Sequence, residues 1–427
     1  MTKKYPTALL RLATTFCIMP ILLLSLTQHA MAHMADNFPI IGVLHAGSKP
    51  EALAVDTQTH LLYITYESPG LIVGFDPISG TVRWRTPLSD AATDVQVDST
   101  SHRVFATAVS YATGRSSLYV MDGASGKIVA TLYAGSGENS IALDTRRHIA
   151  YATSVDQGVI YKYTFSSGWQ NGQPSIQSSR FTSGKHPDAI GVNSRLGRLY
   201  IADSTSNQVA VVNESDERTL ATLPVAALPL PPLRVDEATN RVYVVCSMGQ
   251  ELDVIDGKAN QMLAQIPVAP YPEGMAFNTA TGQLYVADEG DKEGSNQPDS
   301  GTTITVIDGQ SLTVAGNMQL GPGPDGVEAD PTLHRVYVAI EDSNTVVEIA
   351  DSTDLPLTSR NTSGQVLKAQ ETASLLHFAM LLTLIIMVLT IVGSTLGVLS
   401  PRWRGRETPR TPPVAASSRS EPHSLQP

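Results

Sequence analysis

The stretch PEGMAFNTATGQLYVADEG, residues 272–290, contains the pattern that decides the fold: a short apolar segment ends at Asn278, and a second begins with the aromatic Tyr285 seven residues later. This spacing between an Asp or Asn and an aromatic residue occurs seven times. The pairs are Asp56/Tyr63, Asp98/Phe105, Asp144/Tyr151, Asn193/Tyr200, Asp236/Tyr243, Asn278/Tyr285 and Asp330/Tyr337. Successive Asp or Asn positions lie 42, 46, 49, 43, 42 and 52 residues apart, the length of one four-stranded propeller blade. The repeat predicts an all-β, seven-bladed β-propeller.

Each copy also predicts a tight turn between its first two strands. The fourth residue after the Asp or Asn is always His, Gly or Asn, and these residues are enriched at positive φ. In four copies it is a histidine, namely His60, His102, His148 and His334. Because equivalent turns of different blades are spread around one rim, we expect these histidines to be turn residues and not a metal site.

The ends of the repeat predict how the ring closes. The seventh copy stops at Asp351 without a fourth strand, while residues 39–44 form an isolated strand-like segment, PIIGVL. We expect this N-terminal strand to complete the blade begun by residues 325–351, which would leave no open sheet edge between the ends of the repeat. The third copy is less regular and is followed by a polar insertion near residues 168–179.

Residues 1–32 have the layout of a secretory signal peptide. Lys3, Lys4 and Arg11 precede or flank an apolar run over residues 12–26, and Ala30-Met31-Ala32 provides a small-x-small cleavage site. An uncleaved membrane anchor is the alternative. Cys17 would be removed with the signal peptide and would leave Cys246 alone, so we expect no intrachain disulfide in the mature protein.

The remaining chain divides into a propeller over residues 33–353, a flexible Ser- and Thr-rich stalk over 354–372, a transmembrane helix over 373–400 and a disordered cytoplasmic tail over 401–427. No charged residue occurs between Thr372 and Pro401, and such an apolar run is long enough to cross a bilayer. Arginines follow it closely, which favours a cytoplasmic tail. The sequence thus predicts a single-pass protein of the cell membrane with its propeller outside.

The pattern Pro-acid-x-apolar, followed by Leu-Tyr-Val-Ala and Val-Ile-Asp, is clearest in residues 272–308 and 187–213. It resembles the YVTN-repeat propellers of the YncE-like class, over about residues 39–353. This resemblance implies the fold, and a binding or scaffolding role. Some of these propellers are thought to bind DNA. Residues 33–350, however, hold 19 Lys and Arg against 35 Asp and Glu, a net charge of −16, which disfavours nucleic acid and anionic lipid as partners.

Six copies carry an acidic residue near the start of the innermost strand, where the loops of a propeller surround its central channel. These residues are Glu51, Asp94, Glu138, Asp188, Glu273 and Asp325. They could form an acidic ring that holds a divalent cation such as Ca²⁺ or attracts a cationic ligand. Alternatively, each acid caps its own turn. His186, next to Pro187, is a further candidate ligand if the cation is a transition metal.

The loop over residues 288–301 contains five acidic residues and is expected on the same face as the acidic ring. It could cover a ligand or bind Ca²⁺. Its spacing matches no EF-hand, however, and a mobile solvated loop is the alternative.

The sequence contains no haem, phosphate-loop, nucleophile-elbow or zinc-protease motif. We therefore expect a non-catalytic binding or scaffold module that requires no cofactor and has a protein or small-molecule ligand. The alternative is a metal-dependent lactonase of the gluconolactonase type, because Pro272-Glu273-Gly274 and Pro324-Asp325-Gly326 resemble its metal-bearing turns. In such an enzyme, channel carboxylates hold a divalent cation that polarises the ester carbonyl and activates water.

Overall fold

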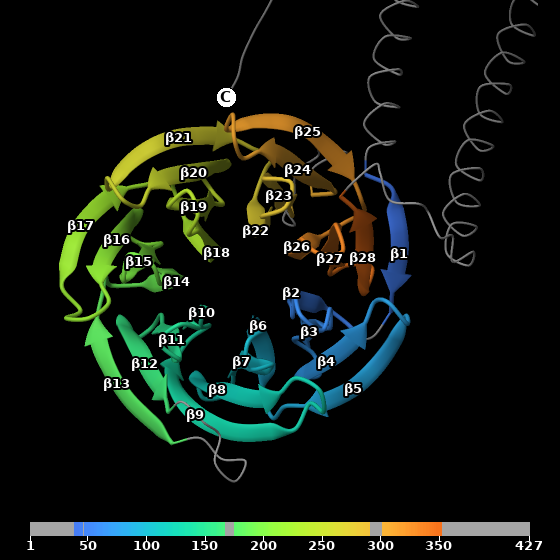
Figure 1. The fold of residues 1–427 in the computed structure, drawn as a ribbon, viewed down its shortest axis with the longest axis horizontal. Helices are drawn as coiled ribbons and strands as arrows, with labels where there is room; N and C mark the ends of the chain where they lie inside the picture. The colour runs from blue at the N-terminus through green and yellow to red at the C-terminus, as the bar shows by residue number, and fades with distance from the viewer. Residues whose placement is uncertain (1–37, 46, 167–174, 291–300, 352–427) are drawn as a thin grey trace, which may run out of the picture. The chain divides into compact units, whose positions relative to one another are not determined.

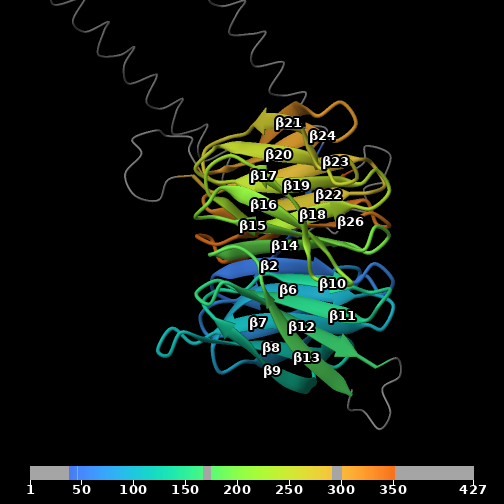
Figure 2. The same cartoon turned by 90° about the vertical axis from the view of Figure 1, so that its left-hand side faces the viewer.

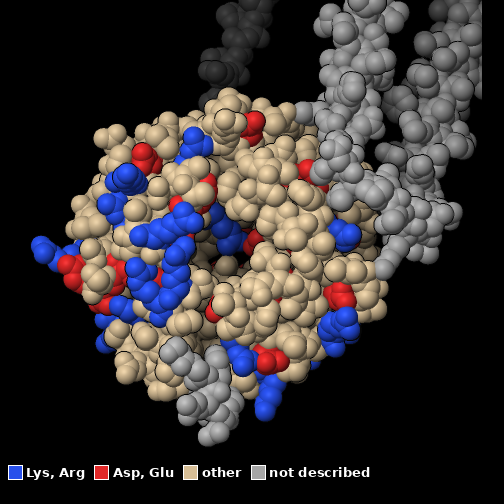
Figure 3. All heavy atoms as spheres, in the orientation of Figure 1, with Lys and Arg blue, Asp and Glu red and all other residues tan. Residues whose placement is uncertain are grey.

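The computed structural model describes residues 38–45, 47–166, 175–290 and 301–351. These residues form a seven-bladed β-propeller, as the repeat predicted, with seven four-stranded antiparallel sheets arranged around a common centre (Figure 1). The space-filling view shows that this centre is hollowed (Figure 3). The described residues contain no helix. Seen from the side, the strands run across the propeller from one rim to the other (Figure 2).

Each blade runs from an innermost strand to an outermost one. Blade 1 holds β2 (Pro50–Val55), β3 (Leu62–Tyr66), β4 (Leu71–Asp76) and β5 (Thr81–Pro87), and blade 2 holds β6 (Ala91–Asp98), β7 (Arg103–Val109), β8 (Arg115–Asp122) and β9 (Ile128–Ser136). Blade 3 holds β10 (Ile141–Asp144), β11 (Ile149–Ser154), β12 (Val159–Phe165) and β13 (Ile176–Thr182), and blade 4 holds β14 (Pro187–Asn193), β15 (Arg198–Asp203), β16 (Gln208–Asn213) and β17 (Thr219–Pro224). Blade 5 holds β18 (Pro229–Asp236), β19 (Arg241–Cys246), β20 (Glu251–Asp256) and β21 (Gln261–Pro267), and blade 6 holds β22 (Pro272–Asn278), β23 (Gln283–Asp288), β24 (Thr303–Asp308) and β25 (Thr313–Gln319). Blade 7 holds β26 (Pro324–Asp330), β27 (Arg335–Ile340), β28 (Thr345–Ala350) and β1 (Ile40–Leu44).

Blade 7 is assembled from both ends of the described chain. β1 pairs antiparallel with β28, from Ile40 opposite Ile349 to Leu44 opposite Val346. The predicted closing strand is thus confirmed, and the ring has no open edge where the first and last repeats meet. In blade 3, β13 begins at Ile176, so part of the segment expected to be a polar insertion forms a regular outer strand; residues 167–174 lie outside the described residues.

The repeated Asp or Asn stabilises its own turn and, in several blades, the next blade. Asp56 Oδ1 accepts a hydrogen bond from the Gln58 amide at 2.9 Å, while its Oδ2 lies 2.7 Å from His102 Nδ1 in blade 2. His60 Nδ1 lies in the same way 2.8 Å from Asp330 Oδ2 of blade 7. All four turn histidines have φ between 52° and 62°, which confirms that they are turn residues.

The aromatic residue seven positions later packs towards the following blade. The Tyr200 hydroxyl donates to the Gly257 carbonyl at 2.9 Å, and the Tyr151 hydroxyl donates to Glu214 Oε1 at 3.0 Å. A Cβ at Gly257 would collide with the Tyr200 hydroxyl. The spacing of seven residues therefore corresponds to two contacts between blades, one at the turn and one in the second strand.

The antiparallel order places the turns after β2, β6 and their equivalents on one rim, here called the turn rim. The loops between second and third strands lie on the opposite rim, here called the mouth. The predicted signal peptide (1–32), stalk (354–372), transmembrane helix (373–400) and tail (401–427) lie outside the described residues, as does loop segment 291–300. Within the described ranges, no helix is long and apolar enough to span a membrane.

Candidate functional site: the channel mouth

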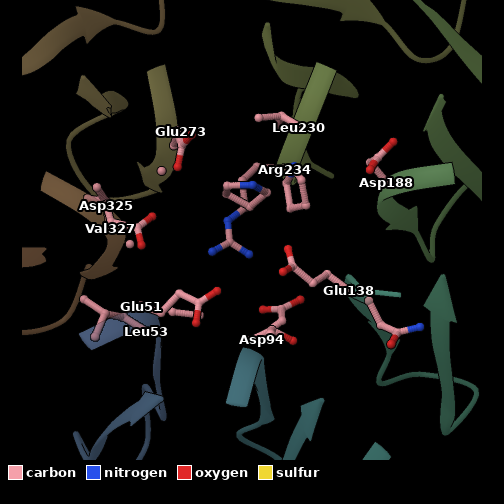
Figure 4. A pocket seen from close by; sticks show the side chains of 17 residues that line it. Glu51, Leu53, Asp94, Glu138, Asp188, Leu230, Arg234, Glu273, Asp325 and Val327 are labelled. Atoms are coloured by element: carbon pink, nitrogen blue, oxygen red, sulfur yellow. The ribbon is translucent and has the colours of Figure 1, made fainter. Parts of the chain in front are cut away.

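The six predicted acidic residues line one cavity of about 280 Å³ at the mouth of the central channel (Figure 4). Glu51, Asp94, Glu138, Asp188, Glu273 and Asp325 come from six different blades. Successive members of this set, which are 43 to 85 positions apart in the sequence, thus lie around a single opening. The shared cavity agrees with the expected acidic ring, whereas its ligand stays a prediction.

Bulges in the innermost strands orient these acidic side chains. The pairing of β2 with β3 shifts register between Pro50 and Leu53, on either side of Glu51. The same shift brackets Glu273, between Pro272 and Met275, and Asp325, between Pro324 and Val327. A bulge adds an unpaired residue and bends the strand, which re-aims its side chain. Proline suits these positions because the ladder does not require its missing N–H.

The glycines that follow two of the acids have a packing role. A Cβ at Gly326 would collide with the Glu51 carbonyl oxygen, and a Cβ at Gly274 would collide with the Asp325 carbonyl oxygen. At these two positions, neighbouring innermost strands therefore approach each other so closely that only a residue without a Cβ fits. The glycine of the Pro-acid-Gly sequence is thus explained by the close packing of neighbouring blades around the channel.

A second, outer cavity of about 310 Å³ adjoins the first and shares four of its acids. It adds Glu67, Glu289 and Glu341, together with Lys49 and Tyr111. The two cavities are thus lined by nine carboxylates and two cations, Lys49 and Arg234. Tyr111 is 62% exposed, and its hydroxyl lies 3.0 Å from Glu67 Oε1 and 3.2 Å from Glu138 Oε1.

Arg234 is the residue of this site that the sequence reasoning missed. Blade 5 has no acid at the equivalent position, and its β18 instead sends the Arg234 guanidinium towards the centre of the ring (Figure 4). Arg234 Nη2 lies 3.0 Å from Glu328 Oε2 of blade 7. The sequence does distinguish Arg234. Two positions before the repeated Asp or Asn, five of the seven copies have a neutral residue, and only Arg234 and Glu328 are charged.

Burial and crowding perturb the acids of the inner cavity. The pKa of Glu51 lies well above its usual range because the carboxyl is buried and because Asp325, Glu138 and other acids surround it. Its Oε2 has no contact with solvent and no hydrogen-bond partner among the described residues. Burial likewise raises the pKa of Asp94 to about 6, although backbone N–H groups and the charge of Arg234 act in the opposite direction. Asp94 therefore changes charge at about pH 6, and the Glu51 carboxyl is held in its neutral form to a higher pH than an exposed glutamate.

Two acids of the ring also have structural roles, as the turn-capping alternative anticipated in part. Asp94 accepts hydrogen bonds from the amides of Val95 at 2.7 Å and of Ile141, in the next blade, at 2.8 Å. Asp188 Oδ2 lies 3.0 Å from Nδ1 of His186, whose side chain is 42% exposed. The sequence could not reveal that Asp94 bridges two blades.

The described side chains do not gather into a compact metal site. Across residues 38–45, 47–166, 175–290 and 301–351, no three His, Cys, Asp or Glu side chains lie close enough together to hold one metal ion. Ca²⁺ needs six to eight oxygen ligands at about 2.3–2.6 Å.

Neither a model of a known protein family nor a curated protein sequence matches this chain. The geometry of the site must therefore carry the functional argument. A propeller fold alone is compatible with binding, scaffolding and catalysis.

Proposed function

We propose that this chain is a non-catalytic binding module whose channel mouth takes organic cations, that is, ammonium or guanidinium groups. One observation carries the proposal: nine carboxylates from the blades surround adjoining cavities that contain two cationic side chains. Acids of one sign around a low-dielectric cleft focus the field and attract ions of opposite charge. The ring of Tyr111 adds an exposed aromatic face, which also favours cations.

The protein's own cations indicate how such groups would be held. Lys49 Nζ lies 3.3 Å from Glu67 and 3.0 Å from Glu341 in the outer cavity, and both acids raise the pKa of its ammonium. Arg234 lies deeper, against Glu328. A flexible ligand with several positive groups could contact both levels, whereas a compact metal ion would reach few of the acids.

The proposed module is held outside the membrane by the predicted C-terminal helix. The uncharged run from Thr372 to Pro401 and the signal-like residues 1–32 support this. The likeness to YVTN-repeat propellers of the YncE-like class supports a binding role of the same general kind. The strongly acidic mouth gives nucleic acid no place to bind there.

The test is site-specific cross-linking on intact cells. A photoreactive amino acid at Tyr111 should capture a repeatable partner or a tagged polyamine, and a lysine-rich peptide or free spermine should compete with capture. The same group at Val314, which is 43% exposed on outer strand β25, is the control. Equal capture at both positions would contradict a specific mouth site. Lactone hydrolysis that a chelator abolishes and Glu273→Gln removes would favour the lactonase alternative.

A further inference from the structure

The interface between blades 2 and 3 differs from those at which Tyr151 and Tyr200 donate to the following blade. At this interface the second-strand aromatic is Phe105, the only phenylalanine at a position that is tyrosine in the other six copies. Phe105 therefore lacks the hydroxyl through which Tyr200 and Tyr151 bind the following blade.

The partner position changes together with it. In the following blade, the residue that faces the second-strand aromatic of the preceding blade stands just after or at the end of the third strand. Its backbone N–H donates to the carbonyl of the positive-φ turn residue of its own blade. These residues include Gly123, Phe165, Glu214, Gly257, Gly309 and Asp351. Only blade 3 carries an aromatic residue there, and the rings of Phe105 and Phe165 meet edge to face, with centroids 5.4 Å apart. A polar contact has been replaced on both sides by an apolar one.

The turn contact is altered at the same place. In blades 1 and 2, the turn histidine is bonded to the marker Asp of the preceding blade. In the next blade pair, Asp98 Oδ2 instead accepts from the Ser101 hydroxyl at 2.7 Å, within its own turn. The exposed His148 lines a cavity. At the interface between blades 2 and 3, both the contact of the turn and the contact of the second-strand aromatic thus differ from those at the interfaces described above.

A cavity of about 260 Å³ opens there on the turn rim. Its walls include Phe105, Phe165, Leu143 and Ile149, and its edge carries hydroxyls and the His148 ring. Arg103 and Asp144 also line it, but each is already paired, Arg103 with Asp122 at 2.6 Å and Asp144 with Arg147 at 2.6 Å. Asp98 lines it too, and its carboxylate accepts hydrogen bonds from the Thr100 amide at 2.9 Å and from the Ser101 hydroxyl at 2.7 Å. The cavity is thus apolar inside and polar at its edge, and its charged side chains are already engaged by neighbouring groups.

We propose that this cavity is a second binding site, separate from the channel, for a small uncharged aromatic molecule. The ring of the ligand would lie against the two phenylalanines, since aromatic groups prefer edge-to-face or offset contacts. An amide or hydroxyl on the ligand would hydrogen-bond at the edge, where Thr100, Ser101, Thr145 and His148 offer partners. The few polar groups around an apolar interior are typical of small-molecule sites.

Benzamide is a suitable probe, titrated by calorimetry into the detergent-solubilised full chain with detergent alone as the blank. We expect saturable binding with one site per chain. Thr145→Trp fills the edge of the cavity from an exposed turn and should weaken binding by at least about tenfold. The matched control is Thr279→Trp, at the equivalent exposed turn position of blade 6, which should leave the affinity unchanged.

Two results would overturn the proposal. One is the absence of saturable binding, and the other is an equal loss of affinity in the two tryptophan variants. Because spermine binding at the mouth is measured separately, failure here is distinguishable from failure of the proposed channel function.

Discussion

Replacing Arg234 by methionine should reveal how the channel tolerates so many acids. Arg234 is the cation of the inner cavity, and it is paired with Glu328 at 3.0 Å. Methionine keeps much of the side-chain volume but removes the charge. Glu328 and Asp94 would then have to lose their charge or remain inside the channel without a counter-ion.

The magnitude follows from burial. Removing one partner of a fully buried ion pair costs about 3–5 kcal/mol. The Arg234 and Glu328 side chains are 21% and 20% exposed, so we expect a smaller loss, about 2–3 kcal/mol near pH 8. For a body of this size, that loss corresponds to a decrease in Tm of roughly 3–5 °C.

The loss should depend on pH with a definite sign. The folded-state pKa of Asp94 is raised from 3.8 to about 6, and burial also raises that of Glu328. A raised carboxyl pKa favours the folded state at low pH, and this advantage disappears as pH rises through the range from 3.8 to about 6. Without the arginine charge both pKa values should rise further. The variant should therefore be nearly as stable as the wild type at about pH 5 and clearly less stable at about pH 8.

The assay is thermal unfolding of the full chain in detergent, followed by circular dichroism at both pH values. Arg218→Met, at an exposed position on the turn rim, is the control and should change the stability by less than about 0.5 kcal/mol. Arg234→Met combined with Glu328→Met should recover much of the loss at the higher pH. An equal Tm decrease at both pH values, or none at about pH 8, would refute the reasoning.

Three further predictions concern the fold. In a urea titration, Tyr200→Phe should lower the free energy of unfolding by about 1 kcal/mol, because the Tyr200 hydroxyl donates to the Gly257 carbonyl at 2.9 Å. Tyr63→Phe is the control and should leave the free energy of unfolding unchanged, because the buried Tyr63 hydroxyl has no hydrogen-bond partner among the described residues. Equal losses in the two variants would contradict this. Deleting residues 38–44 should expose the edge of β28 and shift the elution in size-exclusion chromatography towards larger species; an unchanged elution profile would show that β1 is dispensable. Cys246 is fully buried and burial raises the pKa of its thiol, so in a Cys17→Ser background it should resist maleimide in the native state and react in urea; rapid native labelling would contradict its burial.

Much of the propeller could be predicted from the sequence, because each blade repeats the same local requirements. The turn histidines, the seven Asp or Asn markers and the closing strand at residues 39–44 each followed from spacing and turn chemistry. The sequence could not show that Asp56 and Tyr200 join neighbouring blades, since these contacts depend on how the sheets pack.

The candidate site was predictable in position and incompletely in chemistry. The acids were identified because they recur at one place in the repeat. Arg234 was overlooked because it stands in the copy that lacks an acid, and its role depends on reaching Glu328 two blades away. The explanation of Gly274 and Gly326 also required the structure, because the atoms that exclude a Cβ belong to the following blade.

Calorimetric titration of the full chain with spermine measures directly whether the acidic mouth binds organic cations. We predict saturable binding that weakens as NaCl rises from about 50 mM to about 500 mM. Affinity should decrease at least about tenfold in a variant carrying Glu51→Gln, Glu273→Gln and Asp325→Asn. A control with the same change of charge on the turn rim, carrying Asp216→Asn, Glu217→Gln and Glu237→Gln, should bind as the wild type does. Equal affinity in the wild type and the mouth variant would contradict the account.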